Sequence, residues 1–174
     1  MALREILIEP NKTLREKSLK VEQVDKDLQT LIDDMLETMY AAPGIGLAAI
    51  QVGVPKRVIV LDLAKKDSPK NPMCFVNPEI IEKSKINLTY EEGCLSVPGQ
   101  FAEIDRPDKC YIKYLDYHGQ PQEIRAEGML ATCIQHEIDH LEGILFIDYL
   151  SKLKKSMIVK KLSKQKKELE RIVV

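Results

Sequence analysis

The sequence contains no run of about 18 or more apolar residues, so it predicts no membrane-spanning helix. Its first residues, Met-Ala-Leu-Arg-Glu-Ile, lack the apolar core of a signal peptide and the Arg/Ser-rich composition of a transit segment. It also has no internal repeat and no low-complexity segment, which excludes a repeat architecture. We therefore expect a cytosolic protein with no membrane partner.

Cysteine is scarce and irregularly spaced, with four residues at Cys74, Cys94, Cys110 and Cys133. Without a secretory signal this spacing does not indicate a disulfide framework, so we expect free thiols in a reducing compartment. We interpret Cys74, Cys110 and Cys133 as small buried hydrophobic side chains. Cys94 differs because it follows Gly93 in a turn, where a thiolate can be presented to a ligand.

Composition and charge predict one domain with a basic tail. The 174 residues are 44% hydrophobic and 30% charged, which fits a single domain spanning 1–174. Residues 152–171 hold eight lysines and Arg171 against Glu168 and Glu170. Two interpretations of the segment 152–174 stay open: a helix packed on the body with solvated lysines, or an electrostatic anchor to a nucleic-acid-rich assembly such as the ribosome.

Hydrophobic periodicity predicts three helices and several strands. The first helix covers residues 28–39 behind an Asp25 N-cap, a second covers 129–141, and the basic tail forms an amphipathic third with apolar residues at Leu153, Met157, Ile158, Leu162, Leu169, Ile172 and Val173. Strands are predicted over 57–63, 80–90, 109–116 and 122–126. We expect an α+β fold with a mainly antiparallel sheet packed around the central second helix.

Histidine is also rare, and two of the three histidines form the motif His136-Glu137-Ile138-Asp139-His140. Positions i and i+4 share one face of a helix, so both imidazoles can bind one metal ion while Glu137 lies beside the open coordination position. Glu142 is a poor third ligand because it lies on the wrong face, and His118 falls in a predicted turn. Cys94 is the best remaining supplier, since Gly93 permits a close turn.

Three separated motifs resemble those of the peptide deformylase family: Gly44-Ile45-Gly46-Leu47-Ala48-Ala49-Ile50-Gln51, Glu92-Gly93-Cys94-Leu95-Ser96, and Gln135-His136-Glu137-Ile138-Asp139-His140. The resemblance covers nearly the whole chain. It implies metal ligation by Cys94, His136 and His140, and a catalytic carboxylate at Glu137. The implied reaction removes the N-formyl group from formyl-methionine of newly synthesised polypeptides and releases formate.

Further roles follow from the same resemblance and from residue chemistry. The Gln51 amide and the Leu95 backbone N–H resemble the family's pair of oxyanion donors. We expect the segment Gly44-Ile45-Gly46 to approach the substrate backbone closely. We expect Ile45, Ile134 and Cys133 to line the methionine pocket. We expect Glu92 to pair with Arg106 and to hold the cysteine turn in place. Phe101 stands where some relatives carry an arginine near the peptide cleft.

Two imidazoles and a thiolate suit several divalent metals, namely Zn²⁺, Fe²⁺, Ni²⁺ and Co²⁺, and the resemblance implies Fe²⁺ as the native ion. The competing functional interpretations are a zinc-dependent peptidase or amidase, and a structural metal domain. We expect a monomer that acts on N-formylated nascent polypeptides. Its setting would be the bacterial cytoplasm or an organelle descended from a bacterium.

Overall fold

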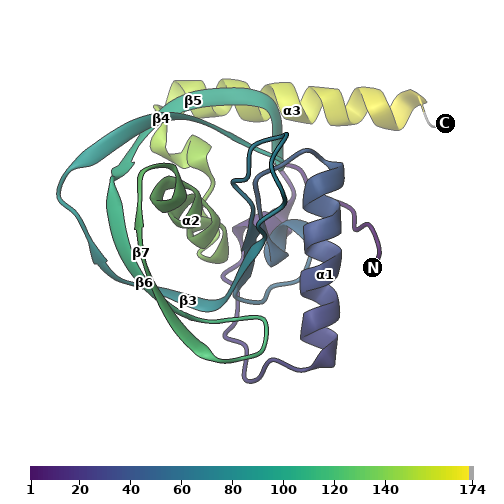
Figure 1. The fold of residues 1–174 in the computed structure, drawn as a ribbon. Helices are drawn as coiled ribbons and strands as arrows, with labels where there is room; N and C mark the ends of the chain where they lie inside the picture. The colour runs from purple at the N-terminus through teal and green to yellow at the C-terminus, as the bar shows by residue number, and fades with distance from the viewer. Residues whose placement is uncertain (173–174) are drawn as a thin grey trace.

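The computed structural model describes residues 1–172 and places two antiparallel sheets around a central helix (Figure 1). The larger sheet has five strands in the order β1-β2-β3-β6-β7, and the smaller pairs β4 with β5. The strands are β1 (Gly46–Ala48), β2 (Val58–Leu61), β3 (Met73–Lys83), β4 (Asn87–Cys94), β5 (Val97–Pro107), β6 (Lys109–Leu115) and β7 (Pro121–Glu127). The helices are α1 (Lys26–Ala41), α2 (Gly128–Leu141) and α3 (Lys152–Ile172), with 3-10 turns η1 (Lys12–Arg15), η2 (Ala49–Val52) and η3 (Phe146–Tyr149). The predicted α+β class is confirmed.

Helix α1 begins where the sequence predicts. The Asp25 side chain accepts a hydrogen bond from the Leu28 backbone N–H at 2.9 Å, which satisfies one of the unpaired amides at the helix start. The helix ends at Ala41, just before Pro43 and Gly44. Its buried face packs on β1 and β2, so it covers the side of the sheet opposite α2.

The extended run predicted over residues 80–90 is wrong, because the chain turns within it. Strand β3 ends at Lys83 and β4 begins at Asn87 in the other sheet. Ser84 closes the turn: its hydroxyl donates to the Ile86 carbonyl at 2.9 Å, and its backbone N–H donates to the Lys109 carbonyl at 3.0 Å. Local side-chain bonds of this kind compete with a continuing strand, although the β-branched residues and the tyrosine of the run favour extension.

Helix α2 lies in the middle of the molecule, enclosed by the two sheets (Figure 1). One side packs on the large sheet through Ala131, Ile134 and Ile138, which join a core that includes Ile59, Phe75 and Ile112. The predicted helix over 129–141 is confirmed within one residue at its start. Because the opposite side of α2 faces the β4–β5 turn, the fold brings the two histidines to the cysteine turn.

Helix α3 confirms the predicted C-terminal helix, but its apolar stripe meets the body only near its middle. Leu162 is buried beside Ile158 and Val159, whereas Leu153, Met157, Leu169 and Ile172 are 62–79% exposed. The predicted stripe also included Val173, which lies outside the described residues, as does the end of the predicted helix at 174. No helix within residues 1–172 is long and apolar enough to cross a membrane.

Candidate metal centre and its cavity

The structure brings together the three predicted metal ligands. The side-chain donor atoms of Cys94, His136 and His140 all lie within 4.8 Å of one another. His140 Nε2 is 3.4 Å from Cys94 Sγ, and the two imidazole rings have centroids 5.1 Å apart. The histidines come from successive turns of α2, and the cysteine comes from the end of β4. This clustering requires both sheets to close around α2.

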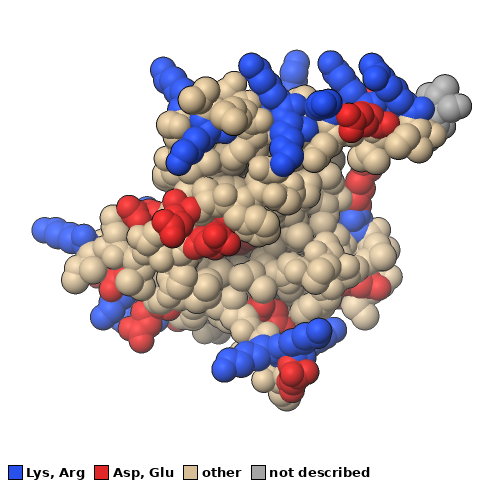
Figure 2. Space-filling model, turned by 90° about the horizontal axis from the view of Figure 1, so that it is seen from above, with Lys and Arg blue, Asp and Glu red and all other residues tan. Residues whose placement is uncertain are grey.

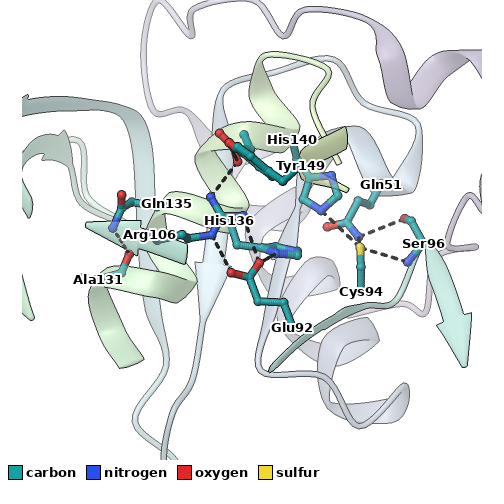
Figure 3. A network of polar contacts seen from close by, with 11 residues as sticks. Gln51, Glu92, Cys94, Ser96, Arg106, Ala131, Gln135, His136, His140 and Tyr149 are labelled. Carbon is teal, nitrogen blue, oxygen red and sulfur yellow. Dashed lines mark hydrogen bonds and ion pairs between the residues drawn. The ribbon is translucent and has the colours of Figure 1, made fainter. Parts of the chain in front are cut away.

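The cysteine turn is held by a small set of polar contacts (Figure 3). Cys94 pairs with Val97 across the hairpin between β4 and β5, after a bulge at Gly93. The Ser96 backbone N–H points at Cys94 Sγ at 3.4 Å, and Gln51 Nε2 donates to the Ser96 hydroxyl at 3.0 Å. These contacts fix the position of the Cys94 thiol.

Gln51 is anchored at the other end of its amide. It is 1% exposed, and its Oε1 accepts from the Ala48 backbone N–H at 2.9 Å. Its Nε2 also lies 3.5 Å from Cys94 Sγ. Because the acceptor side is already bonded, the Nε2 group of this buried amide faces the cysteine sulfur and the Ser96 hydroxyl.

Glu137 is buried beside the ligands, with 5% of its surface exposed and with Oε2 unpaired among the described residues. Burial raises the pKa of Glu137 to about 7. Gly46 makes room for this carboxylate, since a Cβ there would stand 2.5 Å from Glu137 Oε1. Gly44 likewise leaves room for the Leu95 side chain, which would lie 2.6 Å from an added Cβ.

His136 is oriented from behind by a buried ion pair. Its Nδ1 lies 2.8 Å from Glu92 Oε1, which leaves Nε2 for a metal. Arg106 binds the same carboxylate through two bonds, Nε to Oε2 at 2.7 Å and Nη2 to Oε1 at 3.0 Å. Burial would raise the pKa of Glu92, but the hydrogen bonds from His136 and Arg106 hold it below its ordinary value, so the residue is a carboxylate.

This donor set fits a divalent transition metal. A tetrahedral site with bonds of about 2.0–2.3 Å holds its donors about 3–4 Å apart. The distance of 3.4 Å between Cys94 Sγ and His140 Nε2 is of this size, and the ligand atoms of all three residues lie within 4.8 Å of one another. Burial lowers the pKa of His140, so this imidazole is neutral, as ligation requires. Cys94, His136 and His140 would be the three protein ligands of such an ion, and Cys94 and His136 also line the adjoining cavity.

The centre opens into a cavity of about 480 Å³. The lining includes the expected residues Gly44, Ile45, Gly46, Gln51, Leu95 and Cys133. Burial raises the pKa of the Cys133 thiol to about 12, so this wall is uncharged. Ile45 and Phe101 stand at the rim, 51% and 65% exposed. A cavity of this size holds one or two side chains of a peptide.

Comparison with known proteins identifies the family. The family model for polypeptide deformylase matches residues 3–156. A peptide deformylase of Pelagibacter ubique is 63% identical over 174 residues, with both chains covered completely. The crystal structure of peptide deformylase from Ehrlichia chaffeensis superposes with a TM-score of 0.91 at 43% identity, covering 96% of this chain and 98% of that one. A peptide deformylase from Legionella pneumophila gives 0.89 at 47% identity, covering 98% and 99%.

The chain belongs to the peptide deformylase family. Peptide deformylases are metallo-hydrolases, and deformylation of nascent proteins is the function of the family. The resemblance drawn from the three sequence motifs is thereby confirmed. The relation extends to the solved structures, one of which is a complex of the Ehrlichia chaffeensis enzyme with actinonin.

Three residues that the sequence analysis considered lie outside the cavity and the metal centre. Ile134 is buried in the core under the large sheet and does not line the cavity. His118 is exposed in the turn between β6 and β7, as expected, and Glu142 binds Lys17 and Arg57 at the far end of α2. Both are therefore separate from the metal centre.

Sequence reasoning missed several residues around the site. Tyr90, Met129 and Thr132 line the cavity, and Ser96 holds Gln51. Met129 lies four residues before Cys133, and Thr132 lies four residues before His136, so helical spacing was a usable signal for them. Tyr90 offered no such signal, because its approach to α2 depends on how the two sheets close.

Proposed function

We propose that this chain removes the N-formyl group from formyl-methionine at the start of new polypeptides, using a metal held by Cys94, His136 and His140. The observation that carries the proposal is the buried Glu137 carboxylate, whose Oε2 has no partner among the described residues and which lines the cavity beside these ligands. A divalent cation in this position polarises a carbonyl oxygen and lowers the pKa of a water that it binds.

Glu137 would act as the acid and base of the hydrolysis. Its carboxylate takes a proton from the attacking water and delivers it to the leaving amine. Attack on the formyl carbon places negative charge on the formyl oxygen, and donors aimed at that charge stabilise it. The Gln51 Nε2 group, directed at Cys94 Sγ at 3.5 Å, and the Leu95 backbone N–H in the cysteine turn are our candidates.

Substrate binding would use the chain before β1 and the cavity wall. Gly44, Ile45 and Gly46 line the cavity, so a peptide backbone can lie along this segment. Cys133 contributes an uncharged wall suited to the methionine side chain. Phe101 at the rim offers an apolar surface to later residues of the peptide.

The first experiment measures formate release from a formyl-Met-Ala-Ser peptide by protein loaded anaerobically with Fe²⁺. The parent should release formate, and Glu137→Gln should lose activity by a factor on the order of 10²–10⁴ while keeping its metal. An internal peptide bond in the same substrate should stay intact, which separates deformylation from the peptidase interpretation. A metal-loaded, folded parent that releases no formate would overturn the proposal.

We also propose Fe²⁺ as the native metal. An iron-bound thiolate at a site open to solvent is prone to oxidation, whereas zinc is redox-silent. The iron form should lose activity in aerated, peroxide-containing buffer and the zinc form should keep it. An iron form that stays fully active after that treatment would contradict the assignment.

The proposal also includes the partners of the protein and its setting in the cell. We propose a single domain that acts as a monomer in a bacterial cytoplasm, consistent with its bacterial relatives. The lysines of α3 form a blue row along one face of the molecule in Figure 2. We propose that this row binds ribosomal RNA, because phosphate contacts favour clustered lysines.

Ribosome binding can be tested by charge reversal. Replacing both Lys166 and Lys167 by Glu should reduce co-sedimentation with ribosomes and weaken its salt dependence, while formate release from a small peptide stays unchanged. The matched control reverses Lys65 and Lys66, an exposed pair in the β2–β3 connection. Equal loss of ribosome association in both variants would argue against a specific role of α3.

A further inference from the structure

The ion pair behind His136 continues outward to two residues that the sequence left without a role. Arg106 Nη1 donates to Asp139 Oδ2 at 2.8 Å, and the Tyr149 hydroxyl donates to the same oxygen at 2.7 Å (Figure 3). The Arg106 guanidinium also lies over the Tyr149 ring, 5.1 Å from its centroid. A continuous chain of contacts therefore runs from Tyr149 to the metal histidine.

The side chains of this chain of contacts differ in burial, and the difference indicates the role of each. Arg106 and Glu92 have side chains only 5% and 6% exposed, whereas the Asp139 side chain is 19% exposed. A buried guanidinium needs carboxylate partners on its several donors, because an unpaired buried charge is costly. Glu92 satisfies one edge of Arg106 and Asp139 satisfies the other, while Tyr149 closes the network at the surface.

Arg106 and His136 share an acceptor, so they are geometrically linked. Glu92 Oε1 is bonded by both Arg106 Nη2 and His136 Nδ1. Rotation of the guanidinium would therefore shift the oxygen that orients the imidazole. The bond to Asp139 opposes this rotation, and Tyr149 in turn fixes Asp139, which would otherwise be free to turn towards solvent.

The turn η3 supplies a second contact to the same imidazole. The Phe146 ring stacks on the His136 ring with centroids 6.3 Å apart and planes 24° apart. Tyr149 is the last residue of η3 and Phe146 is the first. The same short turn thus holds His136 directly through Phe146 and indirectly through the chain that starts at Tyr149.

We propose that Asp139 and Tyr149 are positioning residues for the metal ligand His136, acting through Arg106 and Glu92. The inference rests on the metal site of the proposed function. The residues that hold the metal site in position then include not only the buried ion pair of Glu92 and Arg106 but also Tyr149 of η3, the segment that leads into α3. Partners of this outer kind fix ligand orientation and raise ligand basicity, so they affect metal affinity.

The test compares Tyr149→Phe and Asp139→Asn with the parent, using zinc affinity measured by chelator competition. We expect affinity to fall about threefold in Tyr149→Phe and about tenfold in Asp139→Asn. The matched control is Tyr117→Phe, which removes another Tyr–Asp bond, from the Tyr117 hydroxyl to Asp33 Oδ2 at 3.1 Å, in the α1 region of the fold. This control should bind zinc like the parent.

A spectroscopic measurement separates positioning from general destabilisation. The ligand-field bands of the Co²⁺ form should shift in Tyr149→Phe and Asp139→Asn but not in Tyr117→Phe, because only the first two reach His136. In a Glu92→Gln background the effect of Tyr149→Phe on zinc affinity should disappear, since its route to His136 is already broken.

The outcomes are distinct. Unchanged affinity and spectra in both variants would overturn the inference, and so would effects that add fully to that of Glu92→Gln. A parent that binds zinc tightly but releases no formate would refute the proposed deformylation and leave these affinity comparisons to decide the positioning role.

Discussion

Helices α2 and α3 follow one another in the chain, separated by η3, yet they relate to the body in opposite ways. Ten residues of α2 are buried, while Leu162 alone is buried among the described residues of α3. Helix α2 carries the two predicted histidine ligands and lies in the middle of the molecule, whereas α3 projects along the outside (Figure 1). The family match, which ends at residue 156, covers all of α2 but only the start of α3.

This difference in burial predicts that the fold tolerates amino-acid substitutions in α3 better than in α2. Most substitutions in α2 would alter the core under the large sheet or the cavity beside the candidate metal centre, because most of its residues face one or the other. In the described part of α3, apolar contact with the body is made by a few side chains near Leu162, and Lys155 forms an ion pair with Asp148 of η3 at 2.7 Å. The exposed remainder is free to carry lysines, whose charge would be costly in a buried helix.

The largest effect should come from removing the cysteine ligand. Cys94→Ala takes away one of three protein donors, so we expect loss of bound metal after dialysis and a fall in formate release of more than about 10³-fold. Metal analysis and a formate assay on the same samples measure both. Cys110→Ala is the matched control, because Cys110 is a buried thiol outside the site and its variant should keep the metal. Retained metal and activity in Cys94→Ala would contradict the ligand assignment.

A methyl group at Gly46 tests how tightly the fold surrounds Glu137. The new Cβ of Gly46→Ala would meet Glu137 Oε1 at 2.5 Å and Leu61 Cδ2 at 2.9 Å, and both atoms belong to buried surroundings. A displaced acid/base should lower kcat by about 10²-fold with metal content unchanged.

The variant Gly93→Ala is the control for Gly46→Ala. Its Cβ would meet the Phe101 ring at 2.6 Å, but that side chain is 65% exposed and can move aside. We therefore expect a change in kcat of less than about tenfold. Equal losses in the two variants would show that the effect of Gly46→Ala is not directed at Glu137.

Core substitutions extend the comparison between the helices to stability. Ile134→Ala in α2 should lower the free energy of unfolding by about 3 kcal/mol, and Leu162→Ala in α3 by about 2 kcal/mol, because both side chains are fully buried. Leu169→Ala should change it by less than about 0.5 kcal/mol, since Leu169 is 65% exposed. Urea unfolding of the three variants decides this order, and a large cost at Leu169 would indicate packing of the distal α3.

The smallest effect should follow truncation after Ser163. No residue beyond Leu162 in the described part of α3 is buried, so the melting temperature should stay within about 2 °C of the parent. Formate release from a small peptide should be unchanged. A truncated protein that melts much earlier, or that loses activity on this substrate, would show that the distal helix supports the body.

Several elements were predictable because their signals are local. The Asp25 cap, the spacing of Leu28, Leu31 and Met35, and the Pro43-Gly44 end define α1 by backbone chemistry alone. The prediction of one continuous strand over residues 80–90 was wrong, because the strand propensity of single residues does not reveal a turn formed by the Ser84 side chain. The apolar stripe of α3 was predicted correctly as a helix pattern, but its burial depends on what lies next to it.

The sequence by itself determined that His136, Glu137 and His140 share a helix, since a period of 3.6 residues places positions i and i+4 on one face whatever surrounds them. It also marked Cys94 by its turn and, through three motifs, the family. Only the tertiary structure decided that Cys94 Sγ lies 3.4 Å from His140 Nε2, and that Tyr149 reaches His136 through three intervening side chains. These contacts join segments remote in the chain, and their geometry depends on how two sheets close around α2 rather than on any local pattern.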